Sequence, residues 1–139
     1  MAKTAGSLYH CRVYYAETDA GGVVYHAAFL NYAERARCEW LRELGYSVAD
    51  LQYTHGLIFA VRNCDIEYLA PAKLDQELTI TTHLLHMGGA SLGLEQIIRH
   101  QDAVLTRLKV TLVAVTTLGK TQRLPEELRE KLQPYLQAA

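Results

Sequence analysis

The chain has 139 residues, of which half are apolar and 21% are charged. This composition is typical of a globular domain with a sizeable core and argues against a disordered chain. Fourteen Lys and Arg residues balance fifteen Asp and Glu residues, with a net charge of -1 and no local basic cluster, so we expect no nucleic-acid partner.

The cysteines and the lengths of the apolar segments indicate the cellular compartment of the protein. Cys11, Cys38 and Cys64 are odd in number, far apart and without a C-x-x-C pair, so they predict neither a disulfide framework nor a zinc site. No apolar run approaches the roughly 20 residues of a membrane-spanning helix, and the first residues lack the pattern of a signal peptide. We therefore expect a cytoplasmic protein without a transmembrane segment and without a cofactor.

The first predicted element is a strand over residues 8–15. Its side chains alternate, which places four of them on one face: Tyr9, Cys11, Val13 and Tyr15. Residues 16–22 contain Asp19 and two glycines, which permit positive φ, so we expect a loop there.

A long helix is predicted from about residue 27 to residue 44. Its apolar side chains recur at helical spacing and form one stripe, made of Phe29, Ala33, Ala36, Trp40 and Leu44. Gly45 then provides a typical end. Such a helix is roughly 27 Å long, enough to cross most of a small sheet. We expect Ala36 and Trp40 to be buried against that sheet.

The rest of the chain is dominated by alternating, β-branched segments. After a loop that contains residues 53–56, we expect four strands, at 57–69, 77–86, 91–100 and 103–117. A short amphipathic helix with Pro125 in its first turn follows. We predict an α+β fold in a single domain, residues 1–139, in which a five-stranded, mainly antiparallel sheet curls around the long helix.

The Asp19 loop is the most informative segment for chemistry. It precedes a helix N-terminus, whose unpaired N–H groups can polarise a carbonyl oxygen. A nearby carboxylate could attack that carbonyl or activate a water, and a thioester suits such a site because a thiol with a pKa near about 8.5 leaves easily. These residues alone leave structural roles open: Asp19 as a turn residue, His26 as a capping residue and Tyr15 as a core residue.

Two blocks of sequence carry a resemblance to a known family. Residues 12–41 contain R-V-Y-Y-x-E-T-D-A-G-G-V-V-Y-H-A-x-F-L, and a second block spans residues 61–75. Together they resemble the 4-hydroxybenzoyl-CoA thioesterase family of hot-dog proteins, and within it the YbgC-type acyl-CoA thioesterases associated with the Tol–Pal system. The resemblance implies hydrolysis of the thioester of acyl-CoA, or of acyl carrier protein, to a free acid and a thiol.

The resemblance also implies roles for single residues. Asp19 matches the catalytic carboxylate, as nucleophile or general base. The backbone N–H of His26 would point at the thioester carbonyl, and Tyr15 would line the site. Our candidates for substrate binding, including the CoA phosphates, are Tyr25, Phe29, Val61, Arg62, Lys73, Arg99 and Arg107. The family further implies a homodimer at least, commonly a tetramer, with the site between subunits.

Other activities remain as alternatives. A hot-dog dehydratase or hydratase typically uses a His-rich loop with a proline, which residues 16–22 lack. A non-catalytic partner that binds acyl-CoA or acyl carrier protein is the other alternative, and turnover by the purified protein discriminates it. Two departures from the family pattern, Ala16 and Ala28, leave the preferred acyl group open. His83 and His86 face opposite sides of a strand and so predict no metal site.

Overall fold

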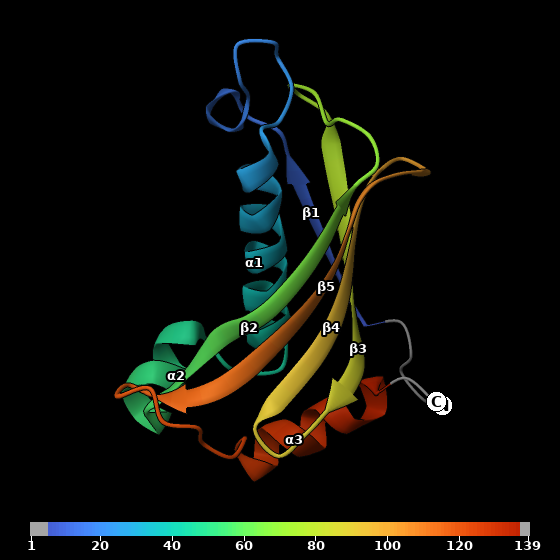
Figure 1. Cartoon of the computed structure of the whole chain (residues 1–139). Helices are drawn as coiled ribbons and strands as arrows, with labels where there is room; N and C mark the ends of the chain where they lie inside the picture. The colour runs from blue at the N-terminus through green and yellow to red at the C-terminus, as the bar shows by residue number, and fades with distance from the viewer. Residues whose placement is uncertain (1–5, 137–139) are drawn as a thin grey trace.

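The computed structural model describes residues 6–136, in which helices pack against one sheet (Figure 1). The strands are β1 Ser7–Arg12, β2 Leu57–Tyr68, β3 Glu77–Met87, β4 Ser91–His100 and β5 Ala103–Thr116. The helices are α1 His26–Glu43, α2 Val48–His55 and α3 Glu126–Leu132, with 3-10 turns at Tyr15–Glu17 and Gln133–Tyr135.

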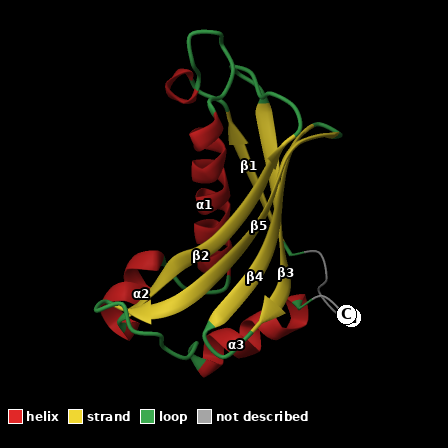
Figure 2. Ribbon diagram, in the orientation of Figure 1, coloured by secondary structure: helices red, strands yellow, loops and turns green. Residues whose placement is uncertain are grey.

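All strand pairs of the sheet are antiparallel, in the order β1-β3-β4-β5-β2 (Figure 2). The β4–β5 hairpin turns at Gln101 and Asp102, where Gln101 has a φ of 54°. The β3–β4 turn falls on residues 88–90. Both turns lie where the sequence predicts them. Because β1 and β2 are the outermost strands, each leaves one side without a strand partner among residues 6–136.

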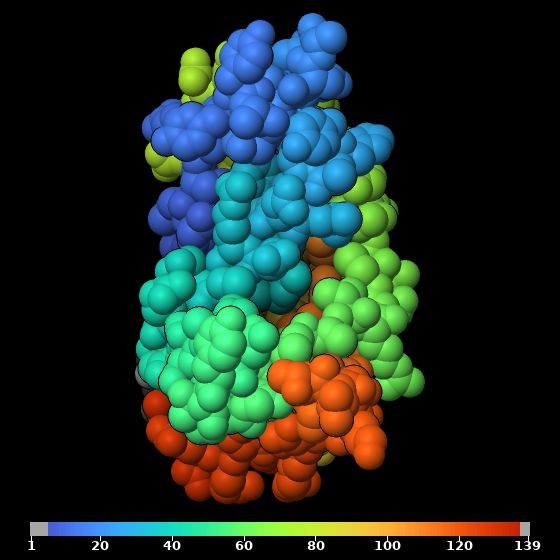
Figure 3. All heavy atoms as spheres, turned by 90° about the vertical axis from the view of Figure 1, so that its left-hand side faces the viewer, coloured from blue at the N-terminus to red at the C-terminus, as the bar shows by residue number. Residues whose placement is uncertain are grey.

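The face of the sheet that α1 covers holds the hydrophobic core. The predicted helix of about residues 27–44 is confirmed, and Ala36 and Trp40 are buried as expected, with 1% and 4% of their surface exposed. The apolar stripe of α1 packs on alternate residues of the strands, such as Leu78, Ile80 and Leu108. Figure 3 shows α1 from its outer side, with β2 beside it and α2 below.

Two local predictions are wrong, and the first concerns residues 53–56. These residues are not simply a loop, because α2 occupies Val48–His55. The hydroxyl of Ser47 accepts the backbone N–H of Asp50 at 2.9 Å, and Gly56 ends the helix in the left-handed conformation. These are standard cap signals, but a helix of 8 residues with only Leu51 buried has little periodicity to detect.

The first strand also ends earlier than predicted, at Arg12 rather than at residue 15. The carboxylate of Glu17 accepts the backbone N–H of Tyr14 at 3.0 Å, which favours a turn at this point. Residues 15–17 therefore form a 3-10 helix, and Tyr15 leaves the sheet with 81% of its surface exposed. Cys11 and Val13 still pack against or within the core.

Candidate active site

A small hairpin between β1 and α1 carries Asp19. The backbone N–H of Asp19 donates to the carbonyl of Val23 at 2.8 Å, and the N–H of Gly22 donates to the carbonyl of Asp19 at 3.1 Å. Thr18 and Val24 pair as an antiparallel bridge. Gly22 has a φ of 79°, a conformation that glycine adopts without steric cost. The local sequence therefore closes a tight turn around the carboxylate.

The Asp19 side chain is held by its own turn. Its Oδ1 accepts the N–H of Gly21 at 2.8 Å and the N–H of Val23 at 3.4 Å, as in an Asx turn. Within residues 6–136, Oδ2 accepts no hydrogen bond. One oxygen thus fixes the orientation of the carboxylate, while the other remains able to act on a substrate or a water.

The hairpin is fastened to the segment after β2. The N–H of Val24 donates to the carbonyl of Ala72 at 2.8 Å, and the N–H of Leu74 donates to the carbonyl of Gly22 at 3.3 Å. Val23 and Lys73 form a bridge. Figure 1 shows both connections at the same end of the sheet. Contacts between segments about fifty residues apart therefore set the position of Asp19.

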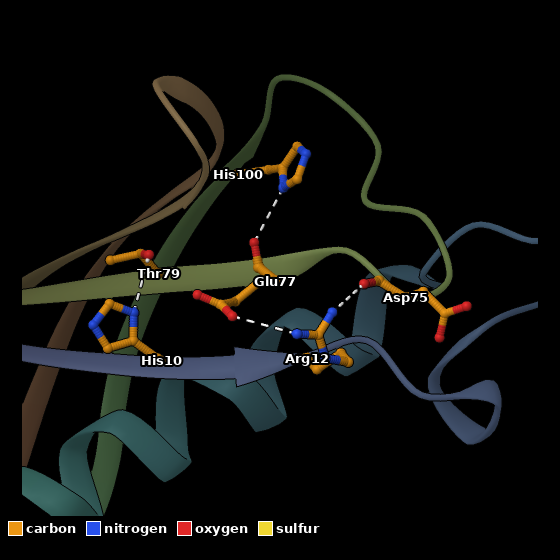
Figure 4. A network of polar contacts seen from close by, with 6 residues as sticks. All are labelled: His10, Arg12, Asp75, Glu77, Thr79 and His100. Atoms are coloured by element: carbon orange, nitrogen blue, oxygen red, sulfur yellow. Dashed lines mark hydrogen bonds and ion pairs between the residues drawn. The ribbon is translucent and has the colours of Figure 1, made fainter.

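A polar network supports that second segment from the β1–β3 edge (Figure 4). The guanidinium of Arg12 donates to the carbonyl of Asp75 at 2.7 Å and pairs with Glu77 at 3.4 Å. His100 hydrogen-bonds the carbonyl of Glu77 at 3.1 Å. Because the Arg12–Glu77 pair is exposed, the hydrogen bond to Asp75 is the more informative contact. It anchors the turn that leads from Lys73 into β3.

Glu17 links the 3-10 turn to the core. Its Oε1 accepts the hydroxyl of Tyr32 at 3.3 Å, and its carbonyl accepts the N–H of Tyr25 at 3.3 Å. Burial, and then the charge of Glu17, raise the pKa of the fully buried Tyr32. Our sequence reasoning missed this pair. A carboxylate three residues after Tyr14 indicates the turn that Glu17 caps, but it does not indicate the hydrogen bond to Tyr32, 15 residues further along the chain.

The helix N-terminus opens beside the hairpin. His26 is the first residue of α1, and Tyr25 at the N-cap position makes no side-chain hydrogen bond to the first turn. In the first turn the N–H of Ala28 donates to the Tyr25 carbonyl at 3.0 Å. The N–H groups of His26 and Ala27 lie at positions that have no partner inside a helix, so this end presents donors and a partial positive charge. The imidazole of His26 instead stacks on Tyr68 at the end of β2, with ring centroids 4.2 Å apart.

A cleft of about 290 Å³ lies at this helix end. Val23 and Val24 of the hairpin, His26 and Phe29 of α1, and Tyr68 with the residues after it line the cleft. Phe29 is buried and meets Tyr68 edge to face, with centroids 5.8 Å apart. The same hairpin thus contributes both a wall of the cleft and the Asp19 carboxylate.

The predicted residues fall into two groups. Asp19, His26, Tyr25, Phe29 and the backbone of Lys73 gather around the hairpin and the start of α1. Tyr15 lies in the adjoining 3-10 helix and accepts the Thr18 hydroxyl through its carbonyl at 2.8 Å. Its exposed ring lines no part of the cleft.

The remaining candidates lie elsewhere on the sheet. Val61 precedes Tyr68 by seven residues of β2, a distance of roughly 23 Å, and Arg62 occupies a register shift beside it. Arg99 on β4 donates to the Thr81 hydroxyl at 3.3 Å, and Arg107 on β5 pairs in register with Glu67. No group of three or more metal-ligating side chains occurs in the described part of the chain.

Comparison with known proteins shows the family of this chain. A family model for the thioesterase-like superfamily matches residues 13–132. The chain is 39% identical over 126 residues to the acyl-CoA thioesterase YbgC of Haemophilus influenzae, covering 89% of this chain and 92% of that one. It is 42% identical over 119 residues to the acyl-CoA thioester hydrolase YbgC of Escherichia coli, covering 84% and 88% respectively.

Solved structures agree with the sequence comparison. The probable thioesterase of Bartonella henselae superposes with a TM-score of 0.81 at 39% identity, covering 85% of this chain and 98% of that one. The expected hot-dog fold, an α+β arrangement with a five-stranded antiparallel sheet, is therefore confirmed. The chain belongs to the thioesterase-like superfamily and, within it, to the family of the YbgC acyl-CoA thioesterases.

Proposed function

We propose that this chain is an acyl-CoA thioesterase that uses the cleft between the Asp19 hairpin and the start of α1. One observation carries the proposal. A carboxylate held by its own turn stands on the same hairpin that forms a wall of a cleft at an uncapped helix N-terminus. The YbgC relatives support the substrate class, since they are acyl-CoA thioesterases of nearly the same length.

The reaction needs two electrostatic contributions. The N–H groups at the start of α1, beginning with His26, stabilise the negative charge that develops on the thioester oxygen. Asp19 either attacks the acyl carbon or takes a proton from the water that does so. The carbon–sulfur bond breaks, the thiol leaves with a proton, and water supplies the hydroxyl of the acid. Both roles of Asp19 give the same products.

The other candidates have supporting roles in this proposal. Tyr15 and Tyr25 flank the hairpin and the helix start, and Phe29 shapes the inner wall of the cleft. Lys73, Arg62 and Arg99 are the proposed partners of the CoA nucleotide, because phosphates require cationic side chains. Val61 is the proposed contact for an acyl chain that extends along β2.

We propose a homodimer as the smallest active assembly, and a tetramer as its larger form. The edge strand β2 exposes apolar side chains, among them Ile58 and Val61, and Leu69 directly after the strand is exposed as well. An exposed apolar edge favours pairing with another strand, and a second copy offers the same edge by two-fold symmetry. Pairing there would place the partner subunit beside Tyr68 and hence beside the cleft.

The cellular setting is also a proposal. We propose a cytoplasmic enzyme associated with the Tol–Pal system, acting on the thioester of acyl-CoA or of acyl carrier protein, as the family resemblance implies. Within residues 6–136, no helix is both long and apolar enough to cross a membrane. We propose further that residues 1–139 act as one domain, because α1, α3 and the strands share one hydrophobic core.

The test is thiol release from acyl-CoA by the purified protein and by Asp19→Asn. Asparagine keeps the side-chain oxygen that accepts the Gly21 N–H, so the turn should survive. Asp102→Asn, in the exposed β4–β5 turn, is the matched control. We expect kcat to fall about a hundredfold or more in Asp19→Asn with a small change in KM. A folded Asp19→Asn variant that keeps most of its activity would refute the assignment.

A further inference from the structure

A buried polar network lies between α1 and the sheet, away from the Asp19 cleft. Gln96 of β4 is fully buried, and its amide nitrogen donates to the carbonyl of Ala33 at 2.9 Å and to the hydroxyl of Thr82 at 3.0 Å. Its amide oxygen accepts one N–H of the Arg37 guanidinium at 2.9 Å. Gln96 therefore holds Arg37 on the face of α1 that turns toward the sheet.

Arg37 lacks a counter-charge there. Within residues 6–136, no carboxylate lies within ion-pair distance of its guanidinium. Burial lowers the pKa of Arg37, and the exposed Glu34 on the previous turn acts in the opposite direction. A guanidinium carries five N–H donors, and a cation removed from water is unfavourable without a partner of opposite charge. The site is therefore electrostatically incomplete.

A cavity of about 260 Å³ adjoins this cation. Its walls come from α1, α2, β2 and β5 and are mostly apolar, and the polar side chains that line it include Arg37, Glu34 and Gln52. Figure 3 shows this side of the molecule, where atoms of β5 are visible between α1 and β2. The cavity thus combines a mostly apolar wall with one cation, Arg37, and with one exposed carboxylate, Glu34, which forms no ion pair with Arg37.

A second buried donor lies next to it. A smaller cavity of about 30 Å³ borders Arg37 and Trp40 and shares Leu41, Phe59 and Leu112 with the larger one. The indole N–H of Trp40 is buried without an acceptor among the described residues. Both polar groups are donors, so the group that would satisfy them is an acceptor, and the charge of Arg37 favours an anion.

We propose that the Arg37 cavity binds a carboxylate carried on a short apolar chain, with the guanidinium of Arg37 as its partner. The cavity is close to the lower end of ligand-site volumes, about 300 Å³, which favours a small ligand. Arg37 follows His26 by eleven residues, roughly 16 Å along α1. The carboxylate belongs either to a free acid or to the far end of an acyl group with two carboxyls. The second source rests on the proposed thioesterase function.

Calorimetric titration with octanoate and with octan-1-ol tests whether the Arg37 cavity binds a carboxylate, which both proposed sources would supply. The two probes have the same chain, so a difference in affinity reports the carboxylate. We expect octanoate to bind wild-type protein at least about tenfold more tightly than octan-1-ol. A charge-assisted hydrogen bond between the carboxylate and Arg37, partly shielded from water, should change the Kd by at least this factor. R37Q should lose this difference, and R42Q, on the exposed side of α1, should keep it.

Three results would overturn the proposal: no octanoate binding, equal affinity for the two probes, or an unchanged difference in R37Q. Circular dichroism checks that R37Q folds. If it does not, the wild-type comparison of octanoate with octan-1-ol still decides, and R37K, which retains the charge, should keep the difference.

Thiol release from octanoyl-CoA and octanedioyl-CoA separates the two sources. A wild-type preference for octanedioyl-CoA that disappears in R37Q assigns the site to the far carboxylate of the acyl group. Equal turnover of both, together with octanoate binding, assigns it to the free acid. Turnover of neither thioester would overturn the proposed function, while the titration result for the Arg37 cavity would stand by itself.

Discussion

The ring of His26 stacks on the ring of Tyr68, with centroids 4.2 Å apart and planes inclined by 19°, and the Tyr68 hydroxyl donates to the His26 carbonyl at 3.2 Å. One residue at the end of β2 thus contacts both the side chain and the backbone of the first residue of α1. These contacts fix the helix N-terminus against the sheet at the cleft.

Tyr68→Ala should lower the free energy of unfolding by roughly 1–3 kcal/mol, because aromatic contacts contribute about 0.5–1.5 kcal/mol each and Tyr68 packs on both His26 and Phe29. Tyr68→Phe keeps the rings and loses one exposed hydrogen bond, so we expect a loss of at most about 1 kcal/mol. Urea unfolding measures both. Equal losses would show that the stacking contributes nothing.

The role of the His26 backbone can be separated from that of its imidazole. His26→Ala and His26→Pro both remove the ring, and only the second removes the N–H. Proline suits the first position of a helix, and Tyr25 before it has the extended backbone that proline requires, with φ -73° and ψ 152°. We expect His26→Pro to lower kcat about a hundredfold more than His26→Ala. Similar kcat values in the two variants would contradict polarisation by this N–H.

The proposed dimer interface predicts unequal effects at the two edges of the sheet. Val61 on β2 and Leu8 on β1 expose 54% and 53% of their surface, so they form a matched pair. A lysine blocks edge pairing, so Val61→Lys should shift sedimentation toward the monomer, whereas Leu8→Lys should leave it unchanged. Dissociation by Leu8→Lys alone would move the interface to β1.

The burial of Cys11 predicts a pH dependence. Burial is the main cause that raises the pKa of the Cys11 thiol, to about 11. At pH 8, a Cys38→Ser/Cys64→Ser variant should react with iodoacetamide about a hundredfold more slowly than a thiol of ordinary pKa, because the thiolate is the reactive form. The rate should rise about tenfold per pH unit up to pH 10. Labelling at the rate of a free thiol would contradict this.

The raised pKa of Cys11 also makes the free energy of unfolding depend on pH. The unfolded thiol ionises near its usual pKa and the folded thiol only near 11, so the folded state binds more protons between these values. The stabilisation is therefore complete below the unfolded pKa and decreases as the pH rises toward the folded pKa. As the pH rises from the unfolded pKa to the folded pKa, the free energy of unfolding of Cys11→Ser should therefore fall less than that of the wild type. Urea unfolding at pH 8 and pH 10.5 compares the two.

The sequence predicts the long elements because their periodicity is strong. The stripe that contains Ala36 and Trp40 shows which face of α1 is buried, and the alternation in residues 103–117 identifies β5 to within one residue. The sequence does not predict α2 because this helix buries a single residue, Leu51, so that only its caps at Ser47 and Gly56 indicate it.

The candidate site is predictable from the sequence only in part, because some of its contacts join residues that are distant along the chain. Asp19 and His26 stand in a dense family motif, so the amino-acid sequence alone pairs the hairpin with the helix start. Glu17 reaches Tyr32, 15 residues on, and Gln96 reaches Arg37, 59 residues back. A buried glutamine in an apolar strand has no local explanation, because its hydrogen-bond partners come from another element.

The bridge between Val23 and Lys73 also sets an order for assembly during synthesis. The ribosome releases the Asp19 hairpin early, but the carbonyl and N–H groups that fasten it belong to Ala72 and Leu74. A nascent chain that stops before this segment lacks the second half of the anchor, however well its helix has formed. Because the closing contact spans about fifty residues, it forms slowly relative to local turns. In the proposed mechanism, the Asp19 hairpin is therefore fully anchored only after residues 72–74, which follow β2, have emerged.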